Sequence, residues 1–565
     1  MVKIAAPVAV VVASVCAVGL AAPAAGSRAV SVSRTMVVVT TTADVVNGNT
    51  SSIAALNRKP GRGGISLREA LLAADHTGGS ATVYILFSPR LNGKTIAIRS
   101  ELPPIHRDHM VVEGIALNGA PARVTIDGRL ARLTPPGMNG GELLLVQASQ
   151  VTVRWLSFNS APTQLGGLDV IPGQNDSVPP STGPLKIANV QILDNVFTGS
   201  GAGEGVVIGN PYFANAHVSG ITIARNTFLD TTSGPNSEAI QVGTNYPTST
   251  AQGVVIEDNT LVGNEWGIEL ASNASTVTRQ TGQQIIGNTI TGGGEGITFD
   301  SGVNGTLIED NTISDTQQPA ITVGADAQII NNVISANSIG LVGIAITGGN
   351  VTIENDTLVN SQSGTLLNAS PVAGAPIDVT IRNSILYAPP GVQPIIAPST
   401  GPYPAHRPDV LTNSLISDPY WAGTNGNING DPLFVNAPGG DYHLTAGSPA
   451  INAGTTIGAP SYDLDGAPRD AQPDIGAFEF GATPRPLLSV TAEQLGGSGT
   501  VTSTPAGISC GTTCGARFDP NTTVTLTAKL DRGSKFLGWS QACSGKTRCT
   551  IRLNSATSVT ARFTP

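Results

Sequence analysis

The sequence predicts an all-β protein whose middle is a right-handed parallel β-helix. Three observations favour this fold class. A short motif recurs at intervals of 21 to 33 residues, each repeat contains only short strand-like runs, and charged residues make up only 12% of the 565 residues. A short strand cannot bury a face alone, but strands stacked coil upon coil enclose one continuous core.

The composition is unusual for a compact globular protein. Aromatic residues make up 4% of the chain, Gly contributes 67 residues, and a typical soluble domain carries about 25% charged residues. Few charges, few aromatics and many glycines suit stacked strands that are joined by tight corners.

The repeated motif has the form aliphatic-x-x-Asn-x-aliphatic, with Phe at the last position in some copies. Equivalent residues of successive coils lie about 4.8 Å apart, so stacked Asn amides can each donate to one neighbour and accept from the other. The alternative, surface turns of a β-sandwich, leaves the aliphatic residues at fixed offsets unexplained. In the last two copies the Asn shifts by one place within the motif. The repeated residues are Asn195, Asn226, Asn259, Asn288, Asn311, Asn332, Asn355 and Asn383.

A second strand-like unit falls between these motifs. It reads EAIQV from Glu238, GIEL from Gly267, GITF from Gly296 and AITV from Ala320. In a strand, alternate side chains point to opposite faces. The aliphatic residues are therefore expected inside, and the outward row is expected to be Gln241, Glu269, Thr298, Thr322 and Ala345.

The segment Ile65–Asp75 predicts a short amphipathic helix. Ser66 is placed to cap its N-terminus and Glu69 to complete a capping box. The apolar stripe comprises Leu67, Ala70, Leu71 and Ala74. Such a helix would cover the open edge of the first coil, which otherwise invites aggregation.

The N-terminus is typical of a secretory signal peptide. Lys3 precedes an apolar run from Ile4 to Leu20, and Ala22-Pro23-Ala24 follows as a small-x-small cleavage site. The run is too short and too weakly apolar to favour a membrane span, and no later stretch is long enough. We therefore expect an extracellular or cell-surface protein with no transmembrane segment after cleavage.

Both ends of the chain resemble modules of bacterial surface proteins. ISLREALLAAD resembles the Cys-Ser-Leu-Arg-Glu-Ala motif of bacterial surface β-helix proteins, with Ile65 in place of Cys. Residues 431–454 and 463–480 are similar to the choice-of-anchor Q module. The tail from Leu487 resembles a divergent internalin-type B repeat. These resemblances imply a pectate-lyase-like solenoid at a bacterial surface.

The expected organisation has five parts. They are a signal peptide at 1–25, an N-terminal helical cap with the first coils at 26–110, the β-helix at 111–400, a choice-of-anchor-like module at 401–480 and a small β domain at 485–565.

Four cysteines remain once the signal peptide is removed, all in the tail. An even number in a secreted module indicates disulfides, and we expect the local pairs Cys510–Cys514 and Cys543–Cys549 among the three pairings that four cysteines allow. Metal binding is the alternative, but the tail contains no His.

Charge is distributed unevenly. The net charge is −9, and the residues from Gly481 onward carry nine Lys or Arg against three Asp or Glu, which leaves −15 for the rest. The acidic charge of the body argues against nucleic-acid binding as its function. The basic tail is suited to anionic cell-wall polymers, although its charge could equally serve solubility alone.

An acidic row beside an aromatic side chain is a candidate sugar-binding groove. A ring can stack on a sugar while polar groups bond to its hydroxyls. The candidate catalytic residues are Glu238, Glu269 and Asp300, and the candidate substrate-binding residues are Gln241, Glu265, Trp266 and Thr298.

The same stretch distantly resembles the alginate lyase and chondroitinase B family. That resemblance implies that Glu238 and Glu269 help to bind Ca²⁺, but it places Ala274 and Asp300 where the family has its basic catalytic groups. Lyase activity is therefore not carried over, and Ca²⁺ is the one cofactor considered, only for a lyase-like groove. Glycoside hydrolysis needs two carboxyl groups about 5–10 Å apart, which Glu238, Glu269 and Asp300 could supply.

The sequence thus predicts a secreted, surface-associated β-helix protein that binds or lies among extracellular polysaccharides. One alternative is a glycoside hydrolase or polysaccharide lyase acting in the groove. Another is a structural or adhesive stalk whose carboxylates only face water.

Overall fold

The computed structural model describes most of the chain between residues 35 and 564. The segments within this range that it does not describe are 115–121, 132–141, 161–165, 173–185, 200–203, 210–214, 230–237, 245–247, 273–277, 337–342, 361–364, 372–376, 390–393, 397–407, 495–497 and 511–512. The expected signal peptide and Ala274 lie outside the described residues.

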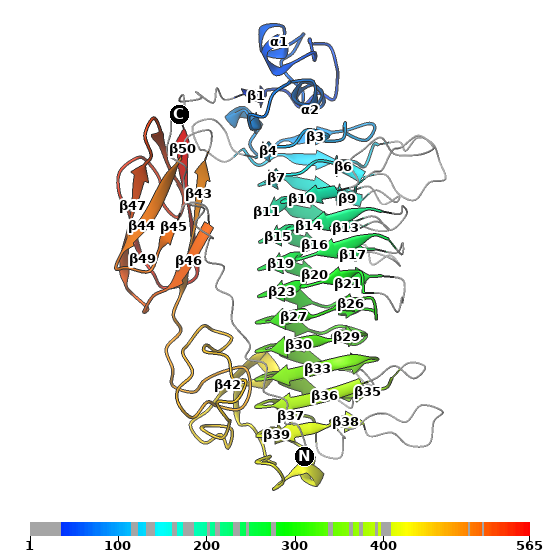
Figure 1. Cartoon of the computed structure of the whole chain (residues 1–565), viewed down its shortest axis with the longest axis vertical. Coiled ribbons are helices and arrows are strands. Elements are labelled where there is room, and N and C mark those ends of the chain that lie inside the picture. Colours follow the sequence, from blue (N-terminus) through cyan, green and yellow to red (C-terminus); the bar gives the residue numbers. More distant parts are fainter. Residues whose placement is uncertain are drawn as a thin grey trace, which may run out of the picture.

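The described strands of the body stack into parallel sheets that wind along one axis (Figure 1). Sheet A consists, in spatial order, of β1 (Thr35–Val39), β2 (Val83–Phe87), β4 (Met110–Glu113), β7 (Val151–Arg154), β11 (Gln191–Leu193), β15 (Thr222–Ala224), β19 (Val255–Glu257), β23 (Gln284–Ile286), β27 (Thr306–Glu309), β30 (Ala327–Ile330), β33 (Gly349–Glu354), β36 (Ile377–Arg382) and β39 (Val410–Thr412). Sheet B consists of β3 (Thr95–Ala97), β5 (Thr125–Asp127), β8 (Ser157–Asn159), β12 (Val196–Thr198), β16 (Thr227–Leu229), β20 (Thr260–Val262), β24 (Thr289–Thr291), β28 (Thr312–Ser314), β31 (Val333–Ala336), β34 (Thr357–Asn360), β37 (Ile385–Tyr387) and β40 (Leu415–Ile416).

Two further parallel sheets complete the coils, one of ten described strands and one of five. Sheet C consists of β6 (Glu142–Val146), β9 (Gly166–Val170), β13 (Val206–Gly209), β17 (Glu238–Gly243), β21 (Trp266–Ala271), β25 (Glu295–Phe299), β29 (Ile321–Val323), β32 (Ile344–Ile346), β35 (Leu367–Ala369) and β38 (Ile395–Ile396). A shorter sheet consists of β10 (Lys186–Ala188), β14 (His217–Ser219), β18 (Thr250–Gln252), β22 (Gln280–Thr281) and β26 (Val303–Asn304). The predicted all-β solenoid is therefore confirmed.

The core is a set of apolar columns parallel to the axis. In sheet A, Ile223, Ile256 and Ile285 lie in register and are fully buried. In sheet B the rings of Phe197 and Phe228 stack with their centroids 4.8 Å apart. One buried aliphatic or aromatic residue per short strand is thus enough, because the next coil supplies its neighbour.

The Asn repeat forms a buried ladder at the corner between sheets A and B. From Asn195 to Asn332, each side-chain Nδ2 donates to the Oδ1 of the next ladder residue at 2.9–3.1 Å. The predicted ladder is confirmed over this span. In the last two copies Asp356 and Ser384 occupy the ladder position, in agreement with the predicted shift of Asn by one place.

Asn355 and Asn383 instead lie one place earlier, where the backbone has a positive φ of 55° and 49°. Asn tolerates this left-handed conformation better than most residues. The side chains then bond to a C-terminal segment that packs along the corner: Asn355 Nδ2 donates to the Asp474 carbonyl at 3.2 Å, and Asn383 Nδ2 to the Thr455 carbonyl at 2.7 Å. The residues between the last coil and the final domain therefore brace the corner from outside.

A helical cap closes the N-terminal end of the solenoid (Figure 1). It comprises α1 (Ile53–Arg58) and α2 (Leu67–Asp75), and the predicted capping box of Ser66 and Glu69 is present in α2. The stripe predicted to face the core is buried. None of the described helices is long and apolar enough to cross a lipid bilayer.

Three short 3-10 turns and one hairpin complete the body. The turns are η1 (Pro89–Leu91), η2 (Pro419–Trp421) and η3 (Ala437–Gly439), and the hairpin pairs β41 (Phe434–Asn436) with β42 (Asp441–Leu444).

The final residues form a separate two-sheet module with its own core, called here the C-terminal module (residues 487–564). One sheet has the order β46 (Thr513–Arg517), β43 (Leu487–Gln494), β50 (Thr557–Thr564), β48 (Lys535–Gln541); the other has β45 (Ser509–Cys510), β44 (Gly499–Thr504), β47 (Thr523–Leu530), β49 (Cys549–Arg552). The predicted Cys543–Cys549 disulfide is present. The side chains of Cys510 and Cys514 lie outside the described residues, so that pairing stays a prediction.

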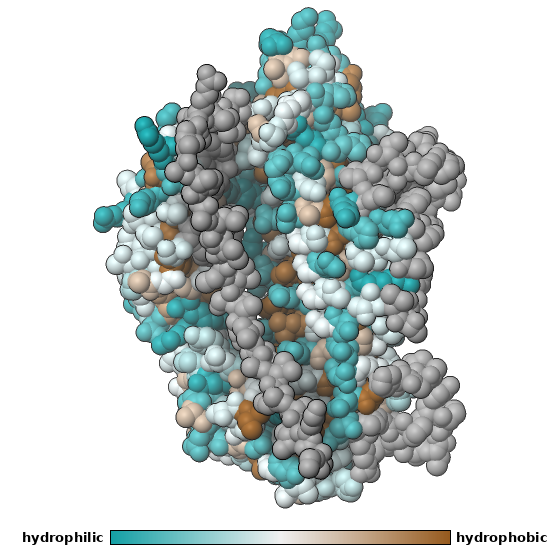
Figure 2. Space-filling view, in the orientation of Figure 1, coloured by the Kyte–Doolittle hydropathy of each residue, from teal (hydrophilic) through white to brown (hydrophobic). Residues whose placement is uncertain are grey.

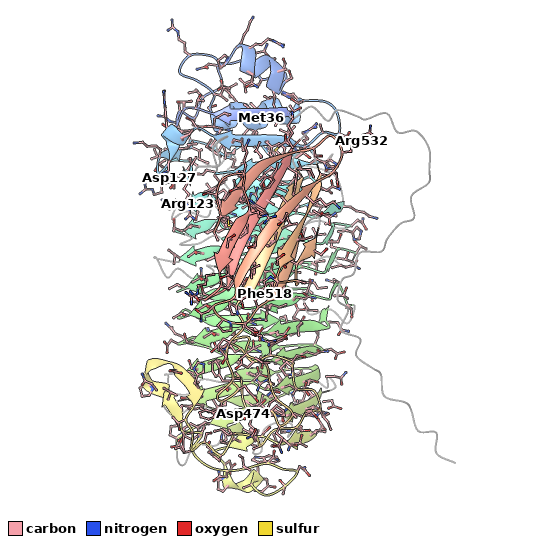
Figure 3. The ribbon with its side chains drawn as sticks, turned by 90° about the vertical axis from the view of Figure 1, so that its left-hand side faces the viewer. Met36, Arg123, Asp127, Asp474, Phe518 and Arg532 are labelled. Atoms are coloured by element: carbon pink, nitrogen blue, oxygen red, sulfur yellow. A yellow bond between two sulfur atoms is a disulfide. The ribbon has the colours of Figure 1, made fainter. Side chains whose placement is uncertain are left out.

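The C-terminal module packs lengthwise against the outside of sheet A, as Figures 1 and 3 show. Four buried charged side chains join the two parts. Arg154 Nη2 lies 3.0 Å from Glu113 Oε2, and Arg562 Nε lies 3.0 Å from Glu493 Oε2. Each Arg also contacts the other Glu, so that two residues of the body and two of the module form a closed network.

Candidate functional site

The outward row expected on sheet C is present in register. Gln241 pairs with Glu269, Glu269 with Thr298, Thr298 with Thr322, and Thr322 with Ala345. The register extends the row toward the N-terminus through Val207 to Asp169. Asp169 and Val207 are buried, at 7% and 4% exposed, so a polymer lying along the axis would meet this row from Gln241 onward.

A second outward row starts the same strands. Glu238 pairs with Trp266, and Trp266 pairs with Glu295. Each of these residues lies three positions before a residue of the first row. With strict alternation of side chains, a residue at that position would point inward. Two residues separate the rows on each strand, and in β21 the first of them is the buried Gly267. A Cβ on Gly267 would lie 2.4 Å from the carbonyl oxygen of Gly296 in the next coil. The tight approach of the coils thus requires Gly there.

Glu238 and Glu269 form a hydrogen-bonded pair of carboxyl groups on neighbouring strands. Gln241 Nε2 donates to Glu269 Oε2 at 2.9 Å. Burial, followed by the charges of Glu269 and Glu204, raises the pKa of Glu238 to about 9. Burial also raises the pKa of Glu269. Two carboxyl groups in contact cannot both ionise easily, so the pair holds a proton at neutral pH.

Three more carboxyl groups extend this acidic cluster, and the sequence analysis missed them. Burial raises the pKa of Asp169, of Glu204 and of Glu295, and the charge of Glu204 raises that of Asp169 further. Asp169 stands between buried Leu168 and Val170, which is the same pattern as Gln241 between Ile240 and Val242. That alternating pattern could have identified Asp169 as an outward residue. The repeats are spaced further apart in the early coils than in the later ones, however, so the pattern is less conspicuous there.

The name acidic face is used below for the outer surface of sheet C around Asp169, Glu204, Glu238, Glu269 and Glu295, together with Gln241, Trp266 and Thr298. Within the part of the chain that the structure describes, three of its carboxyl oxygens are buried and have no hydrogen-bond partner: Asp169 Oδ1, Glu238 Oε2 and Glu295 Oε2. Asp169 is only 7% exposed.

Two of the predicted site residues have local bonds of their own. Asp300 caps the turn after β25: its Oδ2 accepts from Ser272 N at 2.9 Å and its Oδ1 from Gly302 N at 3.0 Å. Thr298 bonds to the carboxyl of Glu295. Glu265 lies directly before β21, close enough for its charge to raise the pKa of Glu295.

Basic side chains of the central coils are engaged elsewhere. Arg279 is buried and its Nη1 donates to the carbonyls of Thr244 and Ser272 at 3.2 and 2.8 Å. Arg225 lies at the corner after β15, where its Nε donates to Asp194 Oδ1 at 3.0 Å. His217 Nδ1 lies 2.9 Å from Thr250 Oγ1.

A metal site was considered for Glu238 and Glu269. Among the described residues, no three or more His, Cys, Asp or Glu side chains are arranged to hold a metal ion. The role of Glu238 and Glu269 in binding Ca²⁺ therefore stays a prediction.

A cavity of about 460 Å³ lies on another side of the molecule, between sheet A and the C-terminal module. Its wall includes the Asp194–Arg225 ion pair, Glu257 and the module residues Glu493 and Gln541. Figure 1 shows the module on the side of the solenoid opposite β17 and β21. Figure 2 shows the surface of the same view, on which hydrophilic residues alternate with single hydrophobic ones.

Comparison with known proteins identifies two regions by family. Residues 276–386 match the right handed beta helix region, and residues 490–565 match the divergent InlB B-repeat domain. The first match confirms the predicted handedness, and the second confirms the resemblance of the tail. No curated protein matches the chain.

Solved structures with a similar fold share little sequence with this chain. The A-module of an Azotobacter vinelandii mannuronan C-5 epimerase is 13% identical over 62% of this chain and 86% of its own, with a TM-score of 0.38. A pectate lyase is 16% identical over 79% and 98%, with a TM-score of 0.36. A periplasmic alginate epimerase is 11% identical over 56% and 73%, with a TM-score of 0.31. By the two family matches, the chain contains a right-handed β-helix region and carries a divergent B-repeat-like module at residues 490–565.

Proposed function

We propose that the acidic face of sheet C binds an extracellular polysaccharide along the axis of the β-helix. The observation that carries this proposal is the register of two outward rows, which places polar side chains on successive coils and one aromatic ring, Trp266, between two carboxyl groups. Strand spacing is about 4.8 Å, so the rows offer a periodic surface to a periodic polymer. Trp266 lies between Glu238 and Glu295, where its ring can stack on a sugar.

Export supports this role. The N-terminal sequence is typical of a secretory signal peptide, and the Cys543–Cys549 disulfide is of the kind that persists in oxidising compartments. The exposed basic side chains of the C-terminal module, Lys529, Arg532, Lys535, Arg548 and Arg552, are available to anionic wall polymers. The protein would then hold polysaccharide at the cell surface.

Binding is tested on the full-length mature chain with a panel of neutral, amine-bearing and acidic polysaccharides. We expect Trp266→Ala and Glu269→Gln each to weaken binding at least about tenfold, which is about 1.4 kcal/mol. Gln284→Ala is the matched control, since Gln284 is an exposed outward residue of sheet A. Unchanged binding in both sheet C variants would reject this face as the site.

Glycoside hydrolysis is a second candidate function, favoured by the proton that Glu238 retains at neutral pH. A general acid of this kind can protonate a leaving oxygen. Glu269, its hydrogen-bonded partner, would supply the second carboxyl group that glycoside hydrolysis requires.

Turnover is measured as the release of reducing ends from each polysaccharide that binds, with and without Ca²⁺. Hydrolysis predicts that Glu238→Gln abolishes release while the chain still folds and binds. A complete absence of products with every bound polysaccharide would leave binding as the function.

A further inference from the structure

The central coils contain almost no positive charge. Between residues 187 and 385 the only Lys or Arg residues are Arg225, Arg279 and Arg382. Arg225 and Arg382 belong to the sheet A side, where they pair with Asp194 and Glu354. Arg279 is 6% exposed and bonds to backbone carbonyls. None of these three Arg side chains is therefore among the groups that shift the pKa of Glu204, Glu238, Glu269 or Glu295.

The acidic face is also built with acceptor atoms that have no donor. Asp169 is 7% exposed, yet its Oδ1 has no hydrogen-bond partner. Glu238 Oε2 and Glu295 Oε2 are likewise buried and unpartnered. A buried carboxyl oxygen without a donor is costly, so the face is incomplete as a purely structural surface.

The chemistry of a fitting ligand follows from this imbalance. A polyuronate would add negative charges beside a cluster of carboxyl groups that already resists ionisation. A neutral sugar would supply hydroxyl donors but no counter-charge. An ammonium group supplies both three N–H donors and a positive charge, and charge-assisted hydrogen bonds to carboxylates are about twice as strong as neutral ones.

We propose that the acidic face selects a polysaccharide bearing protonated amino groups, such as a polymer of glucosamine. The inference rests on the proposed function, since it names the substrate class of the same site. Amino groups on sugars spaced along the axis would meet carboxyl groups on neighbouring coils: Glu204 before β13, Glu238 and Glu269 at β17 and β21, and Glu295 at β25.

Proton release accompanies such binding. Glu238 faces Glu204, Glu269 and Gln241, while Glu295 faces Glu265, Glu269 and Thr298, so no cation opposes either carboxyl. An ammonium group placed beside them favours the ionised form and expels protons that the free protein holds. A neutral sugar leaves these protons in place.

The test uses isothermal titration of the full-length mature chain at slightly acid pH. The probes are a β-1,4-linked glucosamine oligomer, its fully N-acetylated counterpart and an oligogalacturonate of equal length. We expect the glucosamine oligomer to bind at least about tenfold more tightly than the acetylated one, and the galacturonate to bind weakest. We also expect the binding heat of the glucosamine oligomer alone to depend on the ionisation enthalpy of the buffer.

A charge-matched control separates this site from general attraction to an acidic protein. Glu238→Gln with Glu269→Gln should reduce glucosamine affinity at least about tenfold, while Asp378→Asn with Asp531→Asn, two exposed positions away from sheet C, should change it little. Equal or tighter binding of the acetylated oligomer or of the galacturonate would overturn the selectivity while leaving polysaccharide binding intact. Failure of all three probes and of the wider panel would overturn both.

Discussion

The corner between sheets A and B shows how single residues specify this fold. Asn259 illustrates the ladder position: its Nδ2 donates to Asn288 Oδ1 and to the Ile223 carbonyl, while its Oδ1 accepts from the backbone and side chain of Asn226. The residue before it, Asp258, has a φ of 54°. One position thus supplies a left-handed turn and the next supplies the bonds that hold adjacent coils together.

Replacing Asn259 with Leu should lower the free energy of unfolding by about 1–3 kcal/mol, because the amides above and below each lose a buried partner. The measurement is denaturant unfolding of the variant beside Thr260→Leu, an exposed neighbour. The neighbour should change stability by no more than about 0.5 kcal/mol. Equal, small effects at both positions would contradict the ladder as a stabilising device.

Asp356 is the acidic member of the ladder and should impose a pH dependence. Its Oδ1 accepts from Asn332, its Oδ2 is buried without a partner, and burial raises its pKa to about 8. The folded chain therefore holds a proton that the unfolded chain loses near pH 4. The stability contributed by protonated Asp356 is complete below that pH and is lost progressively as the pH rises toward 8.

Asp356→Asn should accordingly raise the free energy of unfolding by about 1 kcal/mol or more at pH 8, and by much less at pH 4. Unfolding curves at the two pH values give the comparison. A gain that is larger at pH 4 than at pH 8 would be incompatible with a carboxyl group buried in its protonated form.

At the scale of strands and modules, the C-terminal module is part of the body rather than a tethered tail. Its β43 and β50 present Glu493 and Arg562 to Glu113 and Arg154 of sheet A. Arg154 also lies over the Trp155 ring, 4.4 Å from its centroid. Removing one member of a buried charge network leaves its partners uncompensated, which typically costs about 3–5 kcal/mol.

Arg562→Met should therefore detach the module from sheet A without unfolding either part. Small-angle scattering of the full chain should show a larger radius of gyration than for the wild type, while Arg552→Met, an exposed site on β49, should leave it unchanged. A compact Arg562→Met variant would show that the ion network does not hold the module in place.

The sequence predicted the repeat, the outward row and the helical cap because each depends on local pattern. Ser66 and Glu69 lie three positions apart in one motif. The outward positions of Gln241 and Glu269 each follow from the alternation of side chains within their own strand. The docking of the module could not be predicted, because Glu113 and Arg562 are 449 residues apart and nothing local links them. The shift of Asn355 by one place could be read from the sequence, but its bond to the Asp474 carbonyl could not, because the two residues are 119 positions apart.

The candidate site was predicted only in part, because local sequence pattern reveals some of its residues and not the contacts between coils. Glu238 and Trp266 were identified near strands that carry the clear repeat. Asp169 and Glu204 were missed because longer loops separate the earlier coils. The direct bond between Glu238 and Glu269, and the absence of a nearby cation, depend on register between coils and on where Arg279 is buried.

For the whole molecule, the two broad faces of the solenoid have different roles. Sheet A is covered along part of its length by the C-terminal module, whereas the carboxyl rows and Trp266 lie on sheet C (Figures 1 and 3). The C-terminal module therefore does not cover the acidic face. A protein held at a surface through the basic residues of the module could still present sheet C to polysaccharide.

The most direct test of this account is a crystal structure of the full-length mature chain with the tightest-binding oligosaccharide. The account predicts sugar density along sheet C across β17, β21 and β25, with one ring stacked on Trp266 and polar groups within hydrogen-bond distance of Glu238 and Glu269. Density confined to the cavity between sheet A and the C-terminal module, or to the module alone, would contradict it.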